Sequence, residues 1–292
     1  MPLFQNKAIY LTIIAILTSS LSHAGPKLAV MESAFGKRVK VENIELAKKA
    51  GYDGIQILTG VLDERGLLPL SYPSLIRSFK EASVKHGVEI VALCAGEMNK
   101  LPCWNPEMKE KAYSTGIQSI QACKALDVPI LLVPFFNAAG FGDDPEDPKF
   151  KAATRLLRVL TSEAEAYGVT LGIESRTKQP AIDHILAEID SPYLKVYYDT
   201  GNMLVVGENV YDVIEHWGDE TICQMHLKSF DSDIGTFGDG KTDLPRLANS
   251  ISKSGYQGWL VFEPGPGKNR KLGFEYAKEN FKRIQGMLSE SH

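Results

Sequence analysis

Short apolar runs alternate with longer amphipathic segments along the chain from residue 27 onward. Nearly continuous apolar runs are typical of parallel strands in a barrel, because such strands are covered on both faces. Eight such runs are predicted to be strands, and they cover Lys27–Met31, Gly54–Leu58, Glu89–Ala95, Pro129–Phe136, Thr170–Glu174, Leu194–Asp199, Ile222–Lys228 and Trp259–Glu263.

The segments between these runs carry apolar residues at helical spacing, and several end at a glycine, for example Gly51, Gly87 and Gly168. The predicted helices cover Val41–Ala50, Ser74–His86, Met108–Leu126, Pro148–Tyr167, Ala181–Ile189, Val210–Trp217, Leu244–Ser254 and Phe274–Leu288. Eight strand–helix pairs predict an α/β fold, a single (β/α)8 TIM barrel. The alternative is an open doubly wound sheet, but no glycine-rich phosphate loop follows the first strand.

The first two dozen residues differ from the rest of the chain. Lys7 is their only charge, the mostly apolar run Ala8–Leu17 follows, and Ser22-His23-Ala24 ends the segment with a small-x-small pattern. This pattern predicts a signal peptide over residues 1–24 and a barrel domain over residues 25–292. We therefore expect an exported protein, periplasmic or extracellular. The apolar run is shorter than the roughly 20 residues that span a bilayer, so no stable membrane anchor is expected.

Composition and charge limit the kinds of binding partner that we expect. The chain has 292 residues with 32 basic and 36 acidic side chains, a net charge of -4, and no basic block, so nucleic acid is not an expected partner. The four cysteines, at 94, 103, 123 and 223, show no zinc-binding spacing. Export would permit a disulfide between Cys94 and Cys103, whereas Cys123 and Cys223 fit buried small hydrophobes.

Four consecutive predicted strands carry an ionisable side chain at or next to their ends: Glu174, Asp199, His226 and Glu263. Active-site groups of barrels project from these ends. One such residue alone is more often a helix cap or a surface group. Three carboxylates in one barrel mouth would repel one another unless a cation neutralised them, so the series predicts a metal site. Three oxygen ligands and one imidazole suit Mn²⁺, with Co²⁺, Mg²⁺ or Zn²⁺ as alternatives.

Longer motifs surround these residues. They are Gly51-Tyr52-Asp53-Gly54-Ile55, Gly172-Ile173-Glu174, Tyr198-Asp199-Thr200-Gly201-Asn202, Met225-His226-Leu227-Lys228, and Gly255-Tyr256-Gln257-Gly258-Trp259 leading into Glu263-Pro264. With these motifs the chain resembles the sugar isomerase/epimerase superfamily of xylose isomerase-like barrels. That superfamily includes ketose 3-epimerases, inosose dehydratases and endonuclease IV.

The resemblance implies that Glu174, Asp199, His226 and Glu263 hold one divalent metal, and that Glu174 and Glu263 are catalytic. The two glutamates would exchange protons with a substrate carbon next to a carbonyl, through an enediolate. The expected function is a metal-dependent isomerase or epimerase that acts on an unphosphorylated sugar or keto-sugar. Alternatives on the same barrel are a 3-keto-glycoside or inosose lyase and, more remotely, an abasic-site endonuclease. A sugar-binding barrel without activity is a further alternative.

One position departs from the pattern, because Asn202 stands where several epimerases carry a histidine. Asparagine can hydrogen-bond a sugar hydroxyl but cannot exchange protons near neutral pH. The candidate substrate contacts are Asn202, Arg176, Lys228, Phe136 and Glu97. The expected partner is a small carbohydrate, and the oligomeric state stays open. The segment Gly265-Pro266-Gly267-Lys268 is interpreted as a tight loop rather than a phosphate site, because sugar phosphates are mostly cytoplasmic metabolites.

Overall fold

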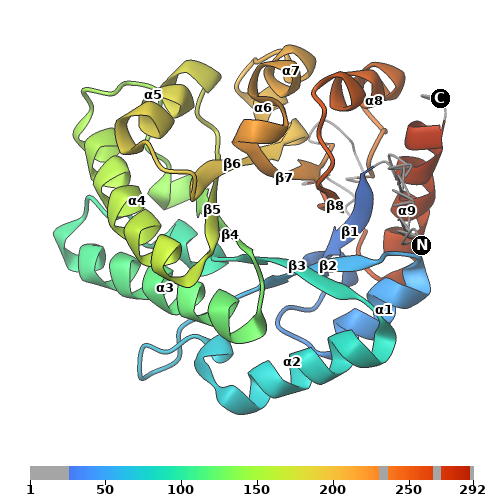
Figure 1. Ribbon diagram of the computed structural model, residues 1–292, viewed down its shortest axis with the longest axis horizontal. Coiled ribbons are helices and arrows are strands. Elements are labelled where there is room, and N and C mark those ends of the chain that lie inside the picture. Colours follow the sequence, from blue (N-terminus) through green and yellow to red (C-terminus); the bar gives the residue numbers. More distant parts are fainter. Residues whose placement is uncertain (1–25, 230–235, 266–270, 290–292) are drawn as a thin grey trace, which may run out of the picture.

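A computed structural model describes residues 26–229, 236–265 and 271–289. Eight parallel strands close into one barrel in chain order, so the predicted (β/α)8 TIM barrel is confirmed (Figure 1). The strands are β1 Lys27–Met31, β2 Gly54–Leu58, β3 Glu89–Cys94, β4 Ile130–Phe135, β5 Thr170–Ser175, β6 Leu194–Asp199, β7 Ile222–Leu227 and β8 Trp259–Phe262. The predicted signal peptide lies outside the described residues and stays a prediction.

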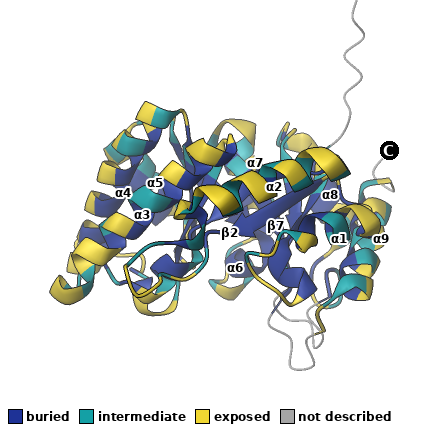
Figure 2. Ribbon diagram, turned by 90° about the horizontal axis from the view of Figure 1, so that it is seen from below, coloured by how far each residue is buried: buried dark blue, intermediate teal, exposed yellow. Residues whose placement is uncertain are grey.

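Helices surround the barrel and leave their outer faces exposed, whereas the strands are buried (Figure 2). The helices are α1 Glu42–Ala50, α2 Pro73–His86, α3 Pro106–Leu126, α4 Pro148–Tyr167, α5 Gln179–Ile189, α6 Thr200–Val205, α7 Val210–Thr221, α8 Leu244–Lys253 and α9 Phe274–Ser289. Four short 3-10 helices stand in the loops: η1 Glu32–Phe35, η2 Pro69–Ser71, η3 Gly96–Lys100 and η4 Asn137–Ala139. None of the described helices is long and apolar enough to cross a membrane.

Local capping explains where the helices begin and end. The side chains of Asn105 and Asp147 accept hydrogen bonds from the first turns of α3 and α4, and each helix then starts with proline. Helix α4 ends at Gly168, whose φ of 68° suits glycine. Helix α7 extends to Thr221, past the end predicted at Trp217, across a non-helical residue at Gly218.

Small residues let the barrel interior accept large polar side chains. A Cβ atom on Gly172 would lie 2.7 Å from Cys223 Sγ and 2.9 Å from Tyr197 Cβ. Glycine in β5 therefore makes room for the Tyr197 ring from β6. All four cysteines carry free thiols, and both Cys94 and Cys103 are buried, so the alternative of a disulfide between them is not realised.

Candidate active site

The four predicted metal ligands converge at the carboxyl ends of β5 to β8. Glu174 lies in β5, Asp199 ends β6, His226 lies in β7, and Glu263 directly follows β8. One ligand atom from each lies within 4.8 Å of the others. The first three are buried and Glu263 is partly buried. Asp199 and His226 are register partners in neighbouring strands, so the parallel sheet itself places them together.

The Nδ1 atom of His226 faces all three carboxylates. It lies 2.9 Å from Glu263 Oε2, 3.1 Å from Glu174 Oε1 and 3.7 Å from Asp199 Oδ2. Burial opposes the charged imidazole, but Glu263 and Glu174 outweigh it and raise the pKa of His226 well above its ordinary value. In this cluster a proton on Nδ1 and a metal ion would compete for the same place.

Burial acts differently on the two most enclosed carboxylates. It raises the pKa of Glu174 to about 7, against the opposing effect of His226. Burial also works to raise the pKa of Asp199, but Lys228 and His226 outweigh it and hold that pKa below its ordinary range. Asp199 is therefore the permanently charged member of the cluster, and Glu174 can exchange a proton near neutral pH.

Lys228 belongs to the carboxylate cluster. Its Nζ lies 2.9 Å from Glu263 Oε2 and 3.3 Å from Asp199 Oδ2. Burial disfavours the ammonium, yet Asp199 and Glu263 raise the pKa of Lys228 well above its ordinary value. Once His226 and Glu174 have released their protons, the three carboxylates and this ammonium leave a net charge of about -2, which a divalent cation would neutralise.

The donor set fits a divalent cation. Three carboxylates and one imidazole nitrogen converge from separate strands, and such a mixed oxygen and nitrogen set suits Mn²⁺, Co²⁺ or Zn²⁺. The buried Oε2 of Glu263 makes no hydrogen bond of good geometry, although His226 and Lys228 lie 2.9 Å away. This oxygen therefore has ion-pair partners and could also serve as a ligand of a cation.

A chain of buried hydrogen bonds reaches the other side of the His226 ring. Gln224 Nε2 donates to the Val91 carbonyl at 3.1 Å, so Gln224 Oε1 accepts from Tyr197 Oη at 2.6 Å. Tyr197 in turn accepts from Gln56 Nε2 at 3.1 Å. Gln56 Oε1 then remains to accept from His226 Nε2 at 2.7 Å. The chain keeps a proton on Nε2, so Nδ1 is the nitrogen that faces the carboxylates and either holds a second proton or would bind a cation.

A cavity of about 250 Å³ opens over this cluster and is lined by Glu174 and Glu263. Four of the five predicted substrate contacts also line it: Asn202, Arg176, Lys228 and Phe136. The fifth, Glu97, does not. It lies in η3, pairs with Lys100 at 2.8 Å and lines a neighbouring cavity.

Asn202 links two of the clustered carboxylates. Its backbone N–H donates to Asp199 Oδ1 at 2.7 Å, and its Nδ2 donates to Glu174 Oε1 at 3.2 Å. Its Oδ1 is buried without a hydrogen-bond partner. On the facing wall, the Arg176 guanidinium lies 5.8 Å from the centre of the Phe136 ring. The Phe136 backbone N–H donates to Asn99 Oδ1 at 2.9 Å.

The polar residues that support the predicted metal ligands were not predicted from the sequence. Gln56, Tyr197 and Gln224 are polar side chains within otherwise apolar strands, and all are buried. Polar residues in a buried strand must find hydrogen-bond partners, so this pattern was the available signal. Glu32, which is fully buried just after β1, was also missed.

Comparisons with known proteins agree with this geometry. The family model for the xylose isomerase-like TIM barrel matches residues 44–284. The 2-epi-5-epi-valiolone 7-phosphate 2-epimerase of Actinoplanes sp. is 27% identical over 197 residues, which cover 66% of this chain and 68% of that enzyme. The D-psicose 3-epimerase of Clostridium cellulolyticum H10, solved with D-tagatose, superimposes with a TM-score of 0.72 at 17% identity and covers 90% of this chain and 99% of that one.

A third similar protein is the IOLI protein, whose structure contains a bound zinc atom. It superimposes with a TM-score of 0.70 at 18% identity, over 91% of this chain and 99% of that one. The family match extends from α1 to α9 and includes all four clustered residues. The chain therefore belongs to the xylose isomerase-like TIM barrel family, and it is an enzyme of the isomerase and epimerase class.

Proposed function

We propose that this enzyme is a metal-dependent sugar epimerase or isomerase that moves a proton on a carbon next to a carbonyl. The observation that carries the proposal is the placement of Glu174 and Glu263. They come from separate strands, line the same cavity, and lie 3.1 and 2.9 Å from the same nitrogen of His226. Two carboxylates beside one small cavity can reach opposite faces of one substrate carbon. One can then remove a proton and the other can return it.

Glu174, Asp199, His226 and Glu263 would hold the cation, with Mn²⁺ preferred over Co²⁺, Mg²⁺ and Zn²⁺. When bound, such a cation supplies the Lewis acidity that polarises the substrate carbonyl. One glutamate removes the proton and leaves an enediolate, and the other returns it. Return to the opposite face of the same carbon gives an epimer, and return to the neighbouring carbon interconverts an aldose and a ketose.

Other residues of the cavity would orient the sugar. Asn202 lines the cavity beside the sugar, and its Nδ2 keeps Glu174 in place. The Phe136 ring covers an apolar face of the sugar, as aromatic rings commonly do. Lys228 holds Asp199 and Glu263 in position through its two ion pairs.

The proposed substrate is an unphosphorylated sugar or keto-sugar, which differs from the 7-phosphate in the name of the Actinoplanes relative. The predicted signal peptide is the reason for this choice, since sugar phosphates are mostly kept inside cells. We propose cleavage after Ala24 and a periplasmic or extracellular location, which N-terminal sequencing of the mature protein tests. Of the predicted tight loop Gly265-Pro266-Gly267-Lys268, only Gly265 lies within the described residues.

Metal content and product mass test the function. Elemental analysis is expected to find about one equivalent of Mn, Co or Zn per mature chain, and much less in His226→Ala. His184→Ala, on the half-exposed face of α5, is the matched control and keeps the metal. Three zinc ions per chain would favour the endonuclease alternative instead. No bound metal after incubation with excess Mn²⁺ would contradict the proposal.

The reaction itself is followed in D2O. Epimerisation or isomerisation conserves the mass of the sugar apart from deuterium exchanged next to the carbonyl, whereas a lyase releases water or an aglycone. Glu174→Gln and Glu263→Gln are each expected to lose turnover at least 100-fold. Sugar that binds but shows neither exchange nor a new product would instead indicate a binding protein.

A further inference from the structure

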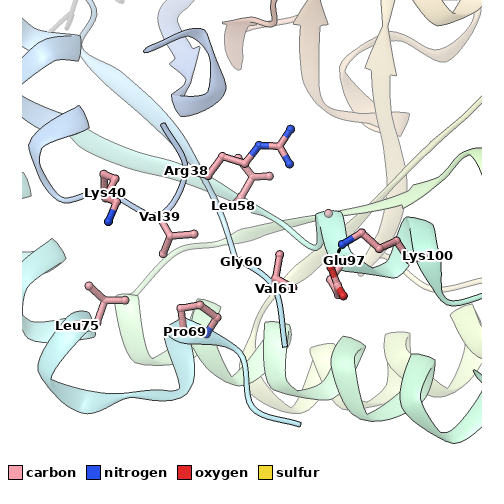
Figure 3. A pocket seen from close by; sticks show the side chains of 11 residues that line it. Arg38, Val39, Lys40, Leu58, Gly60, Val61, Pro69, Leu75, Glu97 and Lys100 are labelled. Atoms are coloured by element: carbon pink, nitrogen blue, oxygen red, sulfur yellow. Dashed lines mark hydrogen bonds and ion pairs between the residues drawn. The ribbon is translucent and has the colours of Figure 1, made fainter. Parts of the chain in front are cut away.

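A second cavity, of about 430 Å³, adjoins the cavity over the carboxylate cluster. The two share three lining residues, Arg38, Leu58 and Gly96, so they lie next to each other near the carboxyl ends of β2 and β3. Nothing in the proposed proton transfer uses the second cavity. We call it the side cavity, and Figure 3 shows the residues that line it.

The side cavity differs chemically from the first. Its wall is mainly apolar, with Val39, Leu58, Val61, Pro69 and Leu75, and the charged side chains of Arg38, Lys40, Glu97 and Lys100 also line it. In Figure 3 the side chains of Val39, Pro69 and Val61 lie between Lys40 on one side and the Glu97–Lys100 ion pair on the other.

Val61 is the most exposed of these apolar residues, with 57% of its surface accessible. An exposed apolar wall beside a polar catalytic cavity is typical of a binding site.

Buried interactions shape the wall. The carboxylate of Glu32 is fully buried and accepts hydrogen bonds from the backbone N–H groups of Val39 at 2.8 Å and Leu58 at 2.9 Å. It also accepts from Asn43 Nδ2 at 2.9 Å. Glu32 therefore fixes two neighbouring segments of the wall, one from the loop after η1 and one from β2.

The backbone conformation of Val39 is a second indication of a binding site. Its φ is 53°, in the left-handed region that β-branched residues rarely adopt. The hydrogen bond from its N–H to Glu32 holds this conformation. Such strain persists only where surrounding structure enforces it, and it gathers at binding sites and active sites. Here it turns the Val39 side chain into the wall of the side cavity.

We propose that the side cavity is a subsite for an apolar group attached to the sugar, so that the enzyme acts on a keto-glycoside, whose ring ketone supplies the carbonyl that the acetal carbon lacks, rather than on a free monosaccharide. This proposal rests on the proposed function, because the sugar ring must lie over the carboxylate cluster for its substituent to reach the side cavity. A phosphate is the competing occupant, because Arg38 and Lys40 also line the cavity, but most of the wall is apolar and the Lys100 ammonium already pairs with Glu97.

Paired binding measurements test the subsite. Calorimetry with the Mn²⁺-loaded full chain compares hexoses and pentoses with their phenyl glycosides and with glucose 6-phosphate. Burial of the phenyl ring is expected to make the best phenyl glycoside bind at least about tenfold more tightly than its parent sugar. Val61→Trp, which fills the side cavity, and Val61→Asp, which removes the apolar wall, should both reduce this ratio towards one.

The matched control is Val84→Trp, since Val84 is 84% exposed in α2 and lines none of the described cavities near the site. It should keep the wild-type ratio. Parent sugars and phenyl glycosides that bind equally, or a ratio that both Val61 variants leave unchanged, would overturn the subsite alone. If glucose 6-phosphate bound more tightly than the phenyl glycosides, the side cavity would be a subsite for an anionic group rather than an apolar one. Failure to bind Mn²⁺ and every sugar would overturn the proposed function and the subsite together.

Discussion

The Nε2 atom of His226 lies 2.7 Å from Oε1 of Gln56, on the side of the imidazole that faces away from the carboxylates. Because Gln56 Nε2 donates to Tyr197, its Oε1 is the end that meets the histidine. The histidine must then donate from Nε2 and offer Nδ1 to a cation. Burial raises the pKa of Tyr197 well above its ordinary value, so its phenol stays a donor to Gln224. Residues that never touch the cation thereby orient one of its ligands.

Gln56→Leu should weaken Mn²⁺ binding about 10- to 100-fold, because the Nε2 proton of His226 loses its acceptor. Gln56→Glu keeps an acceptor at the same place and should retain most of the affinity. Calorimetry gives the dissociation constants, and ¹⁵N spectra of the imidazole report which nitrogen carries the proton. If Gln56→Leu bound Mn²⁺ as tightly as wild type with the same tautomer, Gln56 would have no positioning role.

Lys228→Met should strengthen Mn²⁺ binding while it destabilises the metal-depleted protein. The change removes a buried positive charge that lies 2.9 Å from Glu263 and 3.3 Å from Asp199. Loss of one partner of a buried ion pair costs about 3–5 kcal/mol of unfolding free energy, and a divalent cation can replace the lost charge. Thermal unfolding with EDTA and with Mn²⁺ should therefore show a large drop in Tm that the metal reverses.

Lys80→Met is the matched control for this change. Lys80 pairs with Asp127 at 2.6 Å on the surface, and such pairs contribute only about 0–1 kcal/mol. Its Tm should change little under either condition. An EDTA-treated Lys228→Met protein as stable as wild type would show that the ammonium does not compensate the carboxylates.

The effect of Mn²⁺ on stability should increase with pH. In the absence of a cation, burial raises the pKa of Glu174 from 4.5 to about 7. Between these values the folded chain holds a proton that the unfolded chain has released, so the metal-depleted protein loses stability as pH rises through this window. A bound cation displaces the proton and removes that loss. The gain in Tm from Mn²⁺ should thus be larger at pH 8 than at pH 5.5.

Glu174→Gln provides the comparison, because it cannot release this proton. Its Mn²⁺-dependent gain in Tm should be smaller than that of wild type at pH 8, and it should vary less with pH. Equal gains at pH 5.5 and pH 8 in the wild-type protein would mean that no proton is exchanged for the metal.

The sequence predicted the barrel and the four clustered residues because both follow from simple spacing rules. Each strand is an apolar run, and strands in a barrel end at the same edge, so Glu174, Asp199, His226 and Glu263 had to meet. The structure adds what spacing cannot specify. Helix α6 is too short to show a period and begins because the Asp199 side chain accepts from the Asn202 N–H.

Contacts between distant segments also could not be predicted from the sequence. The link from Gln56 to His226 spans 170 residues, and Glu32 joins the loop at Val39 to Leu58 in β2. Each depends on side-chain direction inside the closed barrel, which no local pattern encodes. The direction of the Glu97 side chain could not be predicted either. Its position after the third strand predicted a substrate contact in the catalytic cavity, but the side chain lines the side cavity.

Gly172→Ala should destabilise the protein by about 1–3 kcal/mol, the usual cost of overpacking a core. The added methyl group would lie 2.7 Å from Cys223 Sγ and 2.9 Å from Tyr197 Cβ, so the Tyr197 ring must shift. Since Tyr197 orients Gln56, Mn²⁺ affinity should fall together with stability. Gly286→Ala, in α9 with no atom within 4 Å of the new Cβ, is the control and should be neutral or slightly stabilising. Chemical denaturation and calorimetry measure both effects. Loss of stability with unchanged Mn²⁺ affinity would show that the packing of Tyr197 and the orientation of His226 are independent.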